Sequence, residues 1–180
     1  HFCTQQFYYF KNDLPLTVLS DLSVLTSDDK SCIRSKAMIR RMQKTDIDIV
    51  SVIWLDANKD AHDFIPAEYW ESNFLPVKEM LLQAEVYVYI DECKNEIEGF
   101  VGLDQEYIAG IFVRKEARSK GIGKALLDFI KEKKQELTLN VYQKNVRAVR
   151  FYERQGFQII DRSIDKSTAE KEYLMRWSCK

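Results

Sequence analysis

The stretch 118–124 carries the clearest chemical signal in this sequence of 180 residues. It reads RSKGIGK and lies between an apolar run at 107–113 and a segment at 121–135 whose apolar residues recur with helical spacing. Gly121 and Gly123 therefore fall at the predicted start of a helix. There the main-chain N–H groups have no intrahelical acceptor, the helix dipole is positive, and the missing Cβ atoms let a ligand approach the main chain. The turn predicts a phosphate-binding site. Nearby cationic side chains are those of Arg118, Lys120 and Lys124.

Two common phosphate-binding motifs do not fit this turn. A P-loop ending at Lys124 needs a glycine in place of Arg118 and a Ser or Thr in place of Ala125 to ligate magnesium. A dinucleotide fingerprint starting at Gly121 needs its third glycine where Leu126 stands, because helix and sheet pack closely there. Neither requirement is met, which disfavours a nucleotide-phosphate hydrolase. The pattern that remains is Arg-x-x-Gly-x-Gly.

A second patterned segment, 140–157, follows downstream and reads NVYQKNVRAVRFYERQGF. Asn145 is expected to cap a helix with its side-chain oxygen, and Gly156 to end the same helix. In order and spacing, the two motifs resemble the pyrophosphate loop and the second motif of the GNAT family of acetyl-CoA-dependent N-acetyltransferases. Core packing alone would explain Phe151 and Phe157, but it does not explain the joint pattern. The sequence is therefore identified as a member of this family.

The resemblance implies the GNAT fold, an α/β (α+β) arrangement in three layers. Its central sheet is mixed and mostly antiparallel, with flanking helices. Apolar periodicity and turn residues agree with the element order β-α-α-β-β-β-α-β-α-β-β. Strands 106–113 and 137–142, joined through a helix, should be parallel neighbours by a right-handed crossover. The resemblance further implies that these two strands splay apart around the pantetheine arm of the cofactor.

Two helices are expected before the first hairpin. The earlier helix should be capped by Thr45 or Asp46. The later helix should start near Pro66 and run to about Gln83, with a bend at Pro76.

The resemblance also assigns an acetyl-CoA site. Main-chain N–H groups on the strand at 111–113 are implied to polarise the thioester carbonyl, which stabilises a developing oxyanion. The glycine turn is implied to hold the pyrophosphate. The residues implied to bind the cofactor are Ile111, Phe112, Val113, Arg118, Ser119, Lys120, Gly121, Ile122, Gly123, Lys124 and Asn145.

Catalysis requires a neutral amine and a proton for the departing thiolate. A lysine-like amine has a free pKa near ~10.4, so a base or an apolar site must favour its neutral form. Tyr152 stands where GNAT enzymes place a tyrosine and is the implied general acid. Glu106 is the candidate base acting through water, although Glu106 and Asp104 could both be merely solvated. His62, in a segment resembling small bacterial GNAT enzymes that include protein-lysine acetyltransferases, is a candidate acceptor-binding residue together with Tyr107. A structural role for His62, capping the second helix, is the alternative.

Length and composition fit one catalytic domain with an appendage. Residues 1–37 contain none of the six glycines and precede the family pattern, so we expect an N-terminal extension, native or translated from upstream, before a domain at 38–180. The charged residues balance to −1, from which no partner can be read, and no like-charge block is long enough to suggest a nucleic-acid or membrane arm, so neither partner is expected. Without an apolar stretch of roughly 18 residues or a signal peptide, a cytoplasmic location is expected. The four cysteines lack C-x-x-C spacing, so no metal site is expected.

The sequence therefore predicts an enzyme that transfers acetyl from acetyl-CoA to a primary amine by direct attack in a ternary complex. Protein lysine or a protein N-terminus leads as the acceptor class, followed by small amines. The alternative function is a non-catalytic acyl-CoA-binding regulatory module, against which the presence of Tyr152 argues. The sequence leaves open the acceptor, the physiological acyl group, the general base, and whether the protein is a monomer or a homodimer.

Overall fold

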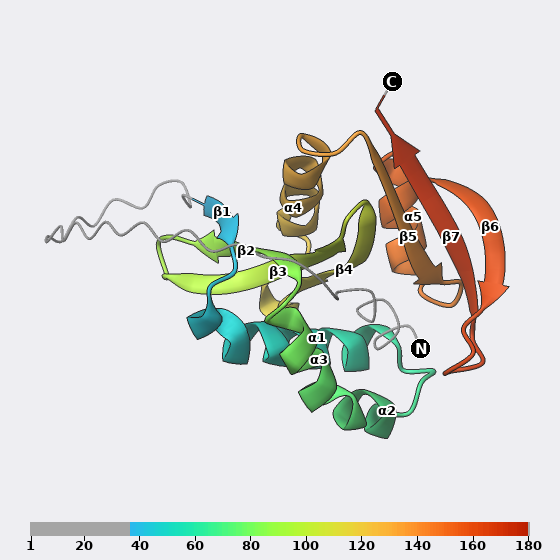
Figure 1. The fold of residues 1–180 in the computed structure, drawn as a ribbon, viewed down its shortest axis with the longest axis horizontal. Coiled ribbons are helices and arrows are strands. Elements are labelled where there is room, and N and C mark those ends of the chain that lie inside the picture. The colour runs from blue at the N-terminus through green and yellow to red at the C-terminus, as the bar shows by residue number, and fades with distance from the viewer. Residues whose placement is uncertain (1–36, 180) are drawn as a thin grey trace, which may run out of the picture.

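A seven-stranded sheet forms the centre of the computed structural model, which describes residues 37–179 (Figure 1). The strand order is β1-β2-β3-β4-β5-β7-β6, and all neighbours are antiparallel except β4 and β5. This mixed, mostly antiparallel sheet confirms the predicted fold class. The strands are β1 (Ala37–Arg41), β2 (Glu85–Asp91), β3 (Glu96–Asp104), β4 (Tyr107–Val113), β5 (Glu136–Tyr142), β6 (Gln158–Ile164) and β7 (Lys171–Ser178). The helices are α1 (Ile47–Ala61), α2 (Ala67–Ser72), α3 (Phe74–Leu81), α4 (Ile122–Lys131) and α5 (Val146–Arg154), with short 3-10 turns η1 (Lys44–Asp46) and η2 (Lys115–Ala117).

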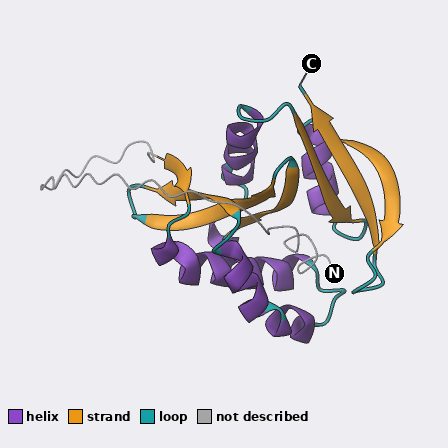
Figure 2. Cartoon of the chain, viewed as in Figure 1, coloured by secondary structure: helices purple, strands orange, loops and turns teal. Residues whose placement is uncertain are grey.

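Helices cover both faces of the sheet and complete three layers (Figure 2). Strand β2 shows why, because successive side chains of a strand point to opposite faces. Val86, Val88 and Ile90 pack with the buried residues of α1, α2 and α3, whereas Tyr87 and Tyr89 pack on the cluster that α4 and α5 bury. Two apolar cores, one on each face, therefore hold the sheet in place.

The parallel strands β4 and β5 pair at a single position and then diverge, as the family resemblance implied. Tyr107 lies opposite Thr138, and the N–H of Thr138 donates to the carbonyl oxygen of Glu106 at 2.9 Å. On its other edge, β4 carries a bulge: Gly102 pairs with Gly110, but the next residue of β3 pairs with Ile108, which leaves one extra residue in β4. A bulge bends and twists its strand, which helps to turn β4 away from β5.

The sequence predicted one long second helix with a bend at Pro76, but the structure has two separate helices, and the break between them does not lie at Pro76. Helix α2 ends at Ser72, and α3 begins at Phe74 after Asn73. Pro76 therefore stands in the first turn of α3, where its missing N–H would have had no intrahelical acceptor and costs nothing. The bend predicted at the proline is replaced by a break three residues earlier.

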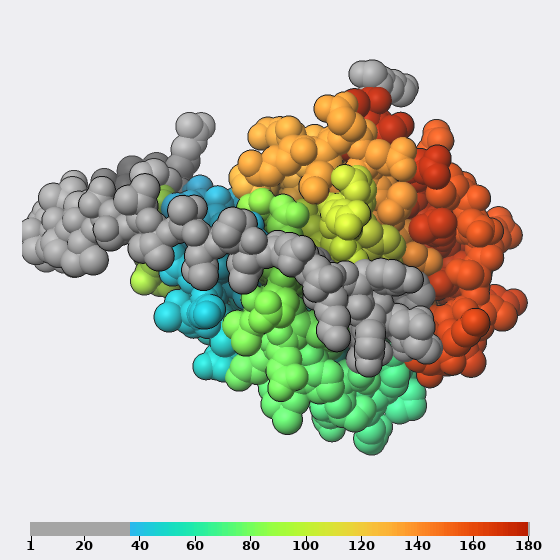
Figure 3. Space-filling view, viewed as in Figure 1, coloured from blue at the N-terminus to red at the C-terminus, as the bar shows by residue number. Residues whose placement is uncertain are grey.

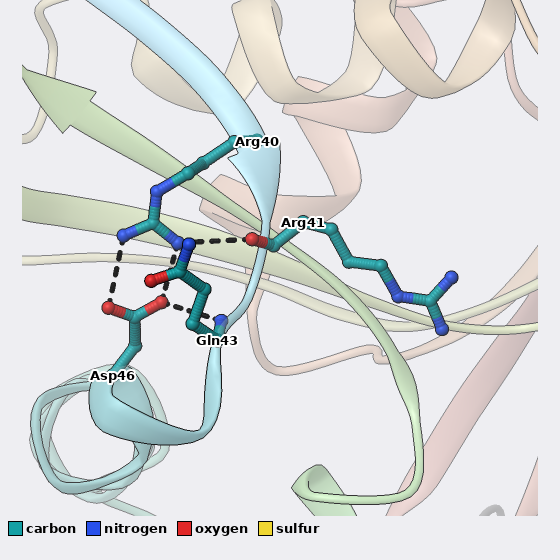
Figure 4. Close-up of polar contacts among 4 residues, drawn as sticks. All are labelled: Arg40, Arg41, Gln43 and Asp46. Carbon is teal, nitrogen blue, oxygen red and sulfur yellow. Dashed lines mark hydrogen bonds and ion pairs between the residues drawn. The ribbon is translucent and has the colours of Figure 1, made fainter. Parts of the chain in front are cut away.

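The corner between β1 and α1 is fixed by an ion pair (Figure 4). The guanidinium of Arg40 donates to both carboxylate oxygens of Asp46, at 2.6 and 3.0 Å. The N–H of Gln43 donates to the same carboxylate at 2.7 Å. The carboxylate of Asp46 thus reaches back to the start of η1 and does not cap α1 itself, in contrast to the expected cap. The hydrogen bond from Arg40 is the largest cause of the lowered pKa of Asp46.

The expected N-terminal extension lies outside the described residues except for Ala37. Ala37 is already the first residue of β1 and pairs with Asp91 of β2. The first described strand therefore begins one residue before the predicted domain boundary at Met38.

Candidate functional site

A cleft of about 740 Å³ lies beside the second half of β4. Its walls come from the end of α1, from β4, from the turn before α4 and from α5. All of the predicted cofactor-binding residues except Lys120 line it, and His62 and Tyr152 line it as well. The fold thus brings residues from distant parts of the chain to one cavity. Glu106 and Tyr107 are not among the residues that line it.

The glycine turn has the main-chain geometry of a ligand-binding helix start. Gly121 is the N-cap of α4 and has a φ of +85°, a conformation that favours glycine. A Cβ added at Gly121 would meet nothing within 4 Å, so the backbone conformation and not packing requires glycine there. The first helical main-chain bond runs from the N–H of Ala125 to the carbonyl of Gly121 at 2.9 Å. The N–H groups before Ala125 lie at the positive end of the helix dipole, where an anion is favoured.

Arg118 ties the turn to the rest of the site. Its Nε donates to the carbonyl oxygen of Val113 at 3.2 Å, and its guanidinium forms an ion pair with Asp60 near the end of α1. Lys115 also lies 3.4 Å from Asp60. The charge of Arg118 is therefore paired with that of Asp60, which Lys115 shares, and the Arg118 side chain joins β4, the turn and α1.

The open edge of β4 presents main-chain groups to the cleft. The N–H of Arg114 donates to the carbonyl of Glu98 on β3 at 2.8 Å. Because main-chain groups of a strand alternate in direction, those of Ile111 and Val113 face the other edge, where β5 has diverged. Of the three main-chain N–H groups predicted to stabilise the oxyanion, those of Ile111 and Val113 therefore remain as candidates.

Tyr152 lies in α5 with its ring packed between Phe151 and Phe157, at centroid distances of 5.1 and 5.5 Å. Its side chain is 8 % exposed and lines the cleft. Burial raises the pKa of the phenol above its usual value near 10. A buried phenol of this kind keeps its proton over the whole physiological pH range, as a general acid must.

His62 and Asn145 meet across the cleft. The Oδ1 atom of Asn145 accepts from the N–H of Ala148 at 3.1 Å, which confirms that Asn145 caps α5. The Nδ2 atom of Asn145 lies 3.2 Å from Nε2 of His62 and is a donor, so Nε2 accepts and the imidazole is neutral. The ring stacks on Trp70 at 5.3 Å, and burial lowers its pKa to about 4. This end of α1 is thereby joined to the start of α5.

The two acidic residues near the start of β4 lie at the surface. The β3–β4 turn is exposed on the face seen in Figure 3, where it is coloured yellow-green beside the gold of α4. Glu106 is exposed and Asp104 is half-buried. Burial, and secondarily the charge of Glu106, raise the pKa of Asp104. Tyr107 lies beside this turn, and its hydroxyl contacts Asn140 of β5.

Arg147 and Phe151 line the cleft, although the sequence did not predict either as a site residue. Arg147 lies in the first turn of α5 and donates to the hydroxyl of Ser119 at 3.3 Å, which links α5 to the glycine turn. The ring of Phe151 lies 3.6 Å from the position that a Cβ added at Gly123 would occupy. Helical spacing from Asn145 could have placed Arg147 near the site, but its contact with Ser119 joins positions 28 residues apart in sequence.

The separated strands β4 and β5, and the glycine turn beside the cleft, agree with the GNAT fold that the sequence resembles. Residues 83–159 match the family model of the acetyltransferase (GNAT) domain. The peptidyl-lysine N-acetyltransferase YiaC of Escherichia coli strain K12 is 33 % identical over 141 residues, which cover 78 % of this chain and 96 % of YiaC. The chain belongs to the GNAT family and is an N-acetyltransferase.

Further relatives agree with this assignment. The peptidyl-lysine N-acetyltransferase YjaB of the same E. coli strain is 30 % identical over 125 residues, covering 69 % of this chain and 84 % of YjaB. The solution structure of apo YjaB from E. coli has a TM-score of 0.71 at 27 % identity, over 79 % of this chain and 97 % of YjaB. The PaiA N-acetyltransferase of Thermoplasma acidophilum, solved in complex with coenzyme A, shares the fold with a TM-score of 0.68 at 21 % identity, over 80 % of this chain and 99 % of PaiA.

The described residues contain neither a membrane-spanning helix nor a metal-binding cluster. Between residues 37 and 179, no helix combines the length and apolar character needed to cross a membrane. Over the same range, no group of three or more His, Cys, Asp or Glu side chains is arranged to hold a metal ion.

Proposed function

We propose that this enzyme transfers the acetyl group of acetyl-CoA to the ε-amine of lysine in proteins. The observation that carries the proposal is the convergence on one cleft of the glycine turn, the open edge of β4 and the buried phenol of Tyr152. These are the parts needed to bind a phosphate-bearing thioester, to polarise its carbonyl and to protonate its leaving group. The relatives YiaC and YjaB, both named peptidyl-lysine N-acetyltransferases, support lysine as the acceptor.

The pyrophosphate of acetyl-CoA is proposed to lie on the N–H groups at the start of α4. The chain at Gly121 and Gly123 has no side-chain atoms to block that approach, and Ser119, Lys120, Ile122 and Lys124 complete the turn. Arg118 holds the turn in place through its bonds to Val113 and Asp60. The pantetheine arm then runs along Ile111, Phe112 and Val113 towards Asn145, whose amide joins α5 to His62.

The chemistry follows from this placement. The neutral amine attacks the thioester carbon, a C–N bond forms, and the N–H of Ile111 or Val113 stabilises the negative charge on oxygen. As the tetrahedral intermediate collapses, the C–S bond breaks and Tyr152 donates its proton to the thiolate. The proton that the acceptor ammonium loses goes to water or through water to Glu106, which remains our candidate base. After the attack the nitrogen carries one proton more than the amide product holds. That proton passes to water as the amide forms, and the phenolate of Tyr152 is reprotonated from solvent.

The acceptor is proposed to approach from the side formed by the α1–α2 segment and the start of β4, where His62 and Tyr107 lie. His62 is neutral and engaged with Asn145, so it suits a wall of this channel and not a base. The monomer or homodimer state and the cytoplasmic location remain predictions from the sequence.

Release of free coenzyme A thiol tests the proposal. The protein is incubated with acetyl-CoA and three acceptors: a peptide with an internal lysine and a blocked N-terminus, a lysine-free peptide with a free N-terminus, and a polyamine. Fastest thiol release with the lysine peptide, and mass addition at its lysine, is the expected result. Release with only the polyamine would refute protein lysine as the acceptor. Tight binding of acetyl-CoA without thiol release for any of the three amines would refute transfer to these acceptor classes.

A further inference from the structure

The main-chain hydrogen bonds between β4 and β5 stop in an unusual way. At the single paired position, Tyr107 opposite Thr138, the N–H of Thr138 donates to the carbonyl of Glu106 at 2.9 Å. In a regular parallel ladder, the next bond on this edge would run from the N–H of Asn140 to the carbonyl of Ile108. Here the N–H of Asn140 donates to the hydroxyl of Tyr107 at 3.0 Å. A side chain of β4 has taken the place of its main chain.

The same hydroxyl is held from a second direction. It donates to Oδ1 of Asn140 at 3.2 Å, while Nδ2 of that amide donates to Oε1 of Glu172 at 3.0 Å. Ser163 donates to the same oxygen of Glu172 at 2.7 Å. Glu172 is only 3 % exposed. A chain of hydrogen bonds therefore runs from Tyr107 on β4 through β5 and β7 to β6, and it fixes the orientation of the Asn140 amide.

This arrangement explains how the strands can separate without leaving the N–H of Asn140 unpaired. A main-chain N–H shielded from water costs free energy if it has no acceptor, which favours continued pairing of neighbouring strands. The Tyr107 hydroxyl supplies that acceptor. Beyond this point β4 turns away towards the cleft.

We propose that Tyr107 is a positioning residue whose hydroxyl holds β4 and β5 apart and thereby sets the opening that receives the pantetheine arm. The proposal rests on the acetyl-CoA site proposed above. It gives Tyr107 a role beyond that of an acceptor-channel wall, since it acts on the cofactor through the spacing of the two strands. The Asn140 amide, oriented by Glu172, is part of the same device.

The test removes only the hydroxyl. In Tyr107→Phe, the N–H of Asn140 loses its hydrogen-bond acceptor and donates to water instead. Hydrogen exchange at the Asn140 amide in the ligand-free protein should therefore be at least tenfold faster. Exchange at the neighbouring Leu139 amide, on the opposite edge of β5, should change little. The Kd for acetyl-CoA should rise about tenfold, with a larger rise in the KM for acetyl-CoA than in the KM for the lysine peptide. Tyr173→Phe, on adjacent β7, is the matched control and should match the parent in both measurements.

Two results would overturn the proposal. One is unchanged Asn140 exchange together with unchanged acetyl-CoA affinity in Tyr107→Phe. The other is a uniform rise in exchange along β5 with unchanged affinity, because that is the pattern of an ordinary packing residue. If Tyr107→Phe folds poorly, Asn140→Ala is measured instead: it removes the amide but keeps the main-chain N–H, and should raise the Kd about threefold, whereas no change would again refute the device. The exchange experiment needs no ligand, so a parent protein that fails to bind acetyl-CoA would refute the proposed function and not this inference.

Discussion

Replacing Gly123 by alanine should stabilise the protein and weaken its binding of acetyl-CoA. A Cβ at Gly123 would lie 3.6 Å from the ring of Phe151 and 3.9 Å from a methyl group of Ile111, both ordinary van der Waals distances. Gly123 is the second residue of α4 and does not have a positive φ. Alanine in a helix is favoured over glycine by up to about 1 kcal/mol, which corresponds to roughly 2–4 °C in Tm for a domain of this size.

The new methyl group would nevertheless stand inside the cleft, because Phe151 and Ile111 both line it. If pyrophosphate lies against the main chain at Gly123, the methyl group excludes it from that distance. We expect the Kd for acetyl-CoA to rise tenfold or more, equivalent to about 1.4 kcal/mol. Stability and binding should therefore change in opposite directions, which general damage to the fold does not produce.

Thermal unfolding and titration calorimetry with acetyl-CoA measure the two effects. Gly121→Ala is the control, because its Cβ would meet open space but its φ of +85° is strained for alanine. That variant should lose about 1–2 kcal/mol of stability. An unchanged Kd in Gly123→Ala would show that the ligand does not approach this part of the main chain and would refute the reasoning.

Three further predictions concern ionisable side chains. Tyr152→Phe should fold and bind acetyl-CoA normally while kcat falls roughly 10²-fold, the scale for losing a general acid. Because burial raises the pKa of the Tyr152 phenol, ionisation of Tyr152 should not lower the kcat of the parent at any pH below about 10. Turnover of the phenylalanine variant within a few-fold of the parent would make Tyr152 a packing residue. Burial lowers the pKa of His62 to about 4, whereas its value in the unfolded chain is ~6.5. Between these two pKa values the unfolded state binds more protons than the folded state, so the free energy of unfolding should fall as the pH drops from about 7 to 4. Urea unfolding of His62→Phe should show a shallower pH slope, and an equal slope would contradict the burial argument. Asp46→Asn should lose about 1 kcal/mol at pH 7, because the lowered pKa of Asp46 contributes stability that is present above about pH 4 and lost as pH falls through the folded pKa. A difference between Asp46→Asn and the parent that persists undiminished at pH 2 would show that charge is not the cause.

The sequence alone determined the family, the fold class and the cofactor motif, because each depends on local chemistry. Gly121 needs its positive φ whatever surrounds it, and Asn145 caps α5 through an N–H three residues away. The alternation in β2 and the spacing of apolar residues in α4 likewise follow from strand and helix geometry. These features depend on residues that are close together in the sequence, so their positions could be predicted to within a few residues.

Tertiary structure decided which of these residues meet. The sequence indicated Arg118 as a cation near the ligand, and only the fold shows that its guanidinium also pairs with Asp60, 58 positions away. His62 and Asn145 are 83 positions apart in the sequence. The role of Asn145 as a helix cap could not by itself indicate that a neutral imidazole lies beside its amide group. The point at which β4 leaves β5 depends on a hydrogen bond from Asn140 to the side chain of Tyr107. Such contacts depend on where whole strands and helices are packed, and no local pattern of residue types encodes that placement.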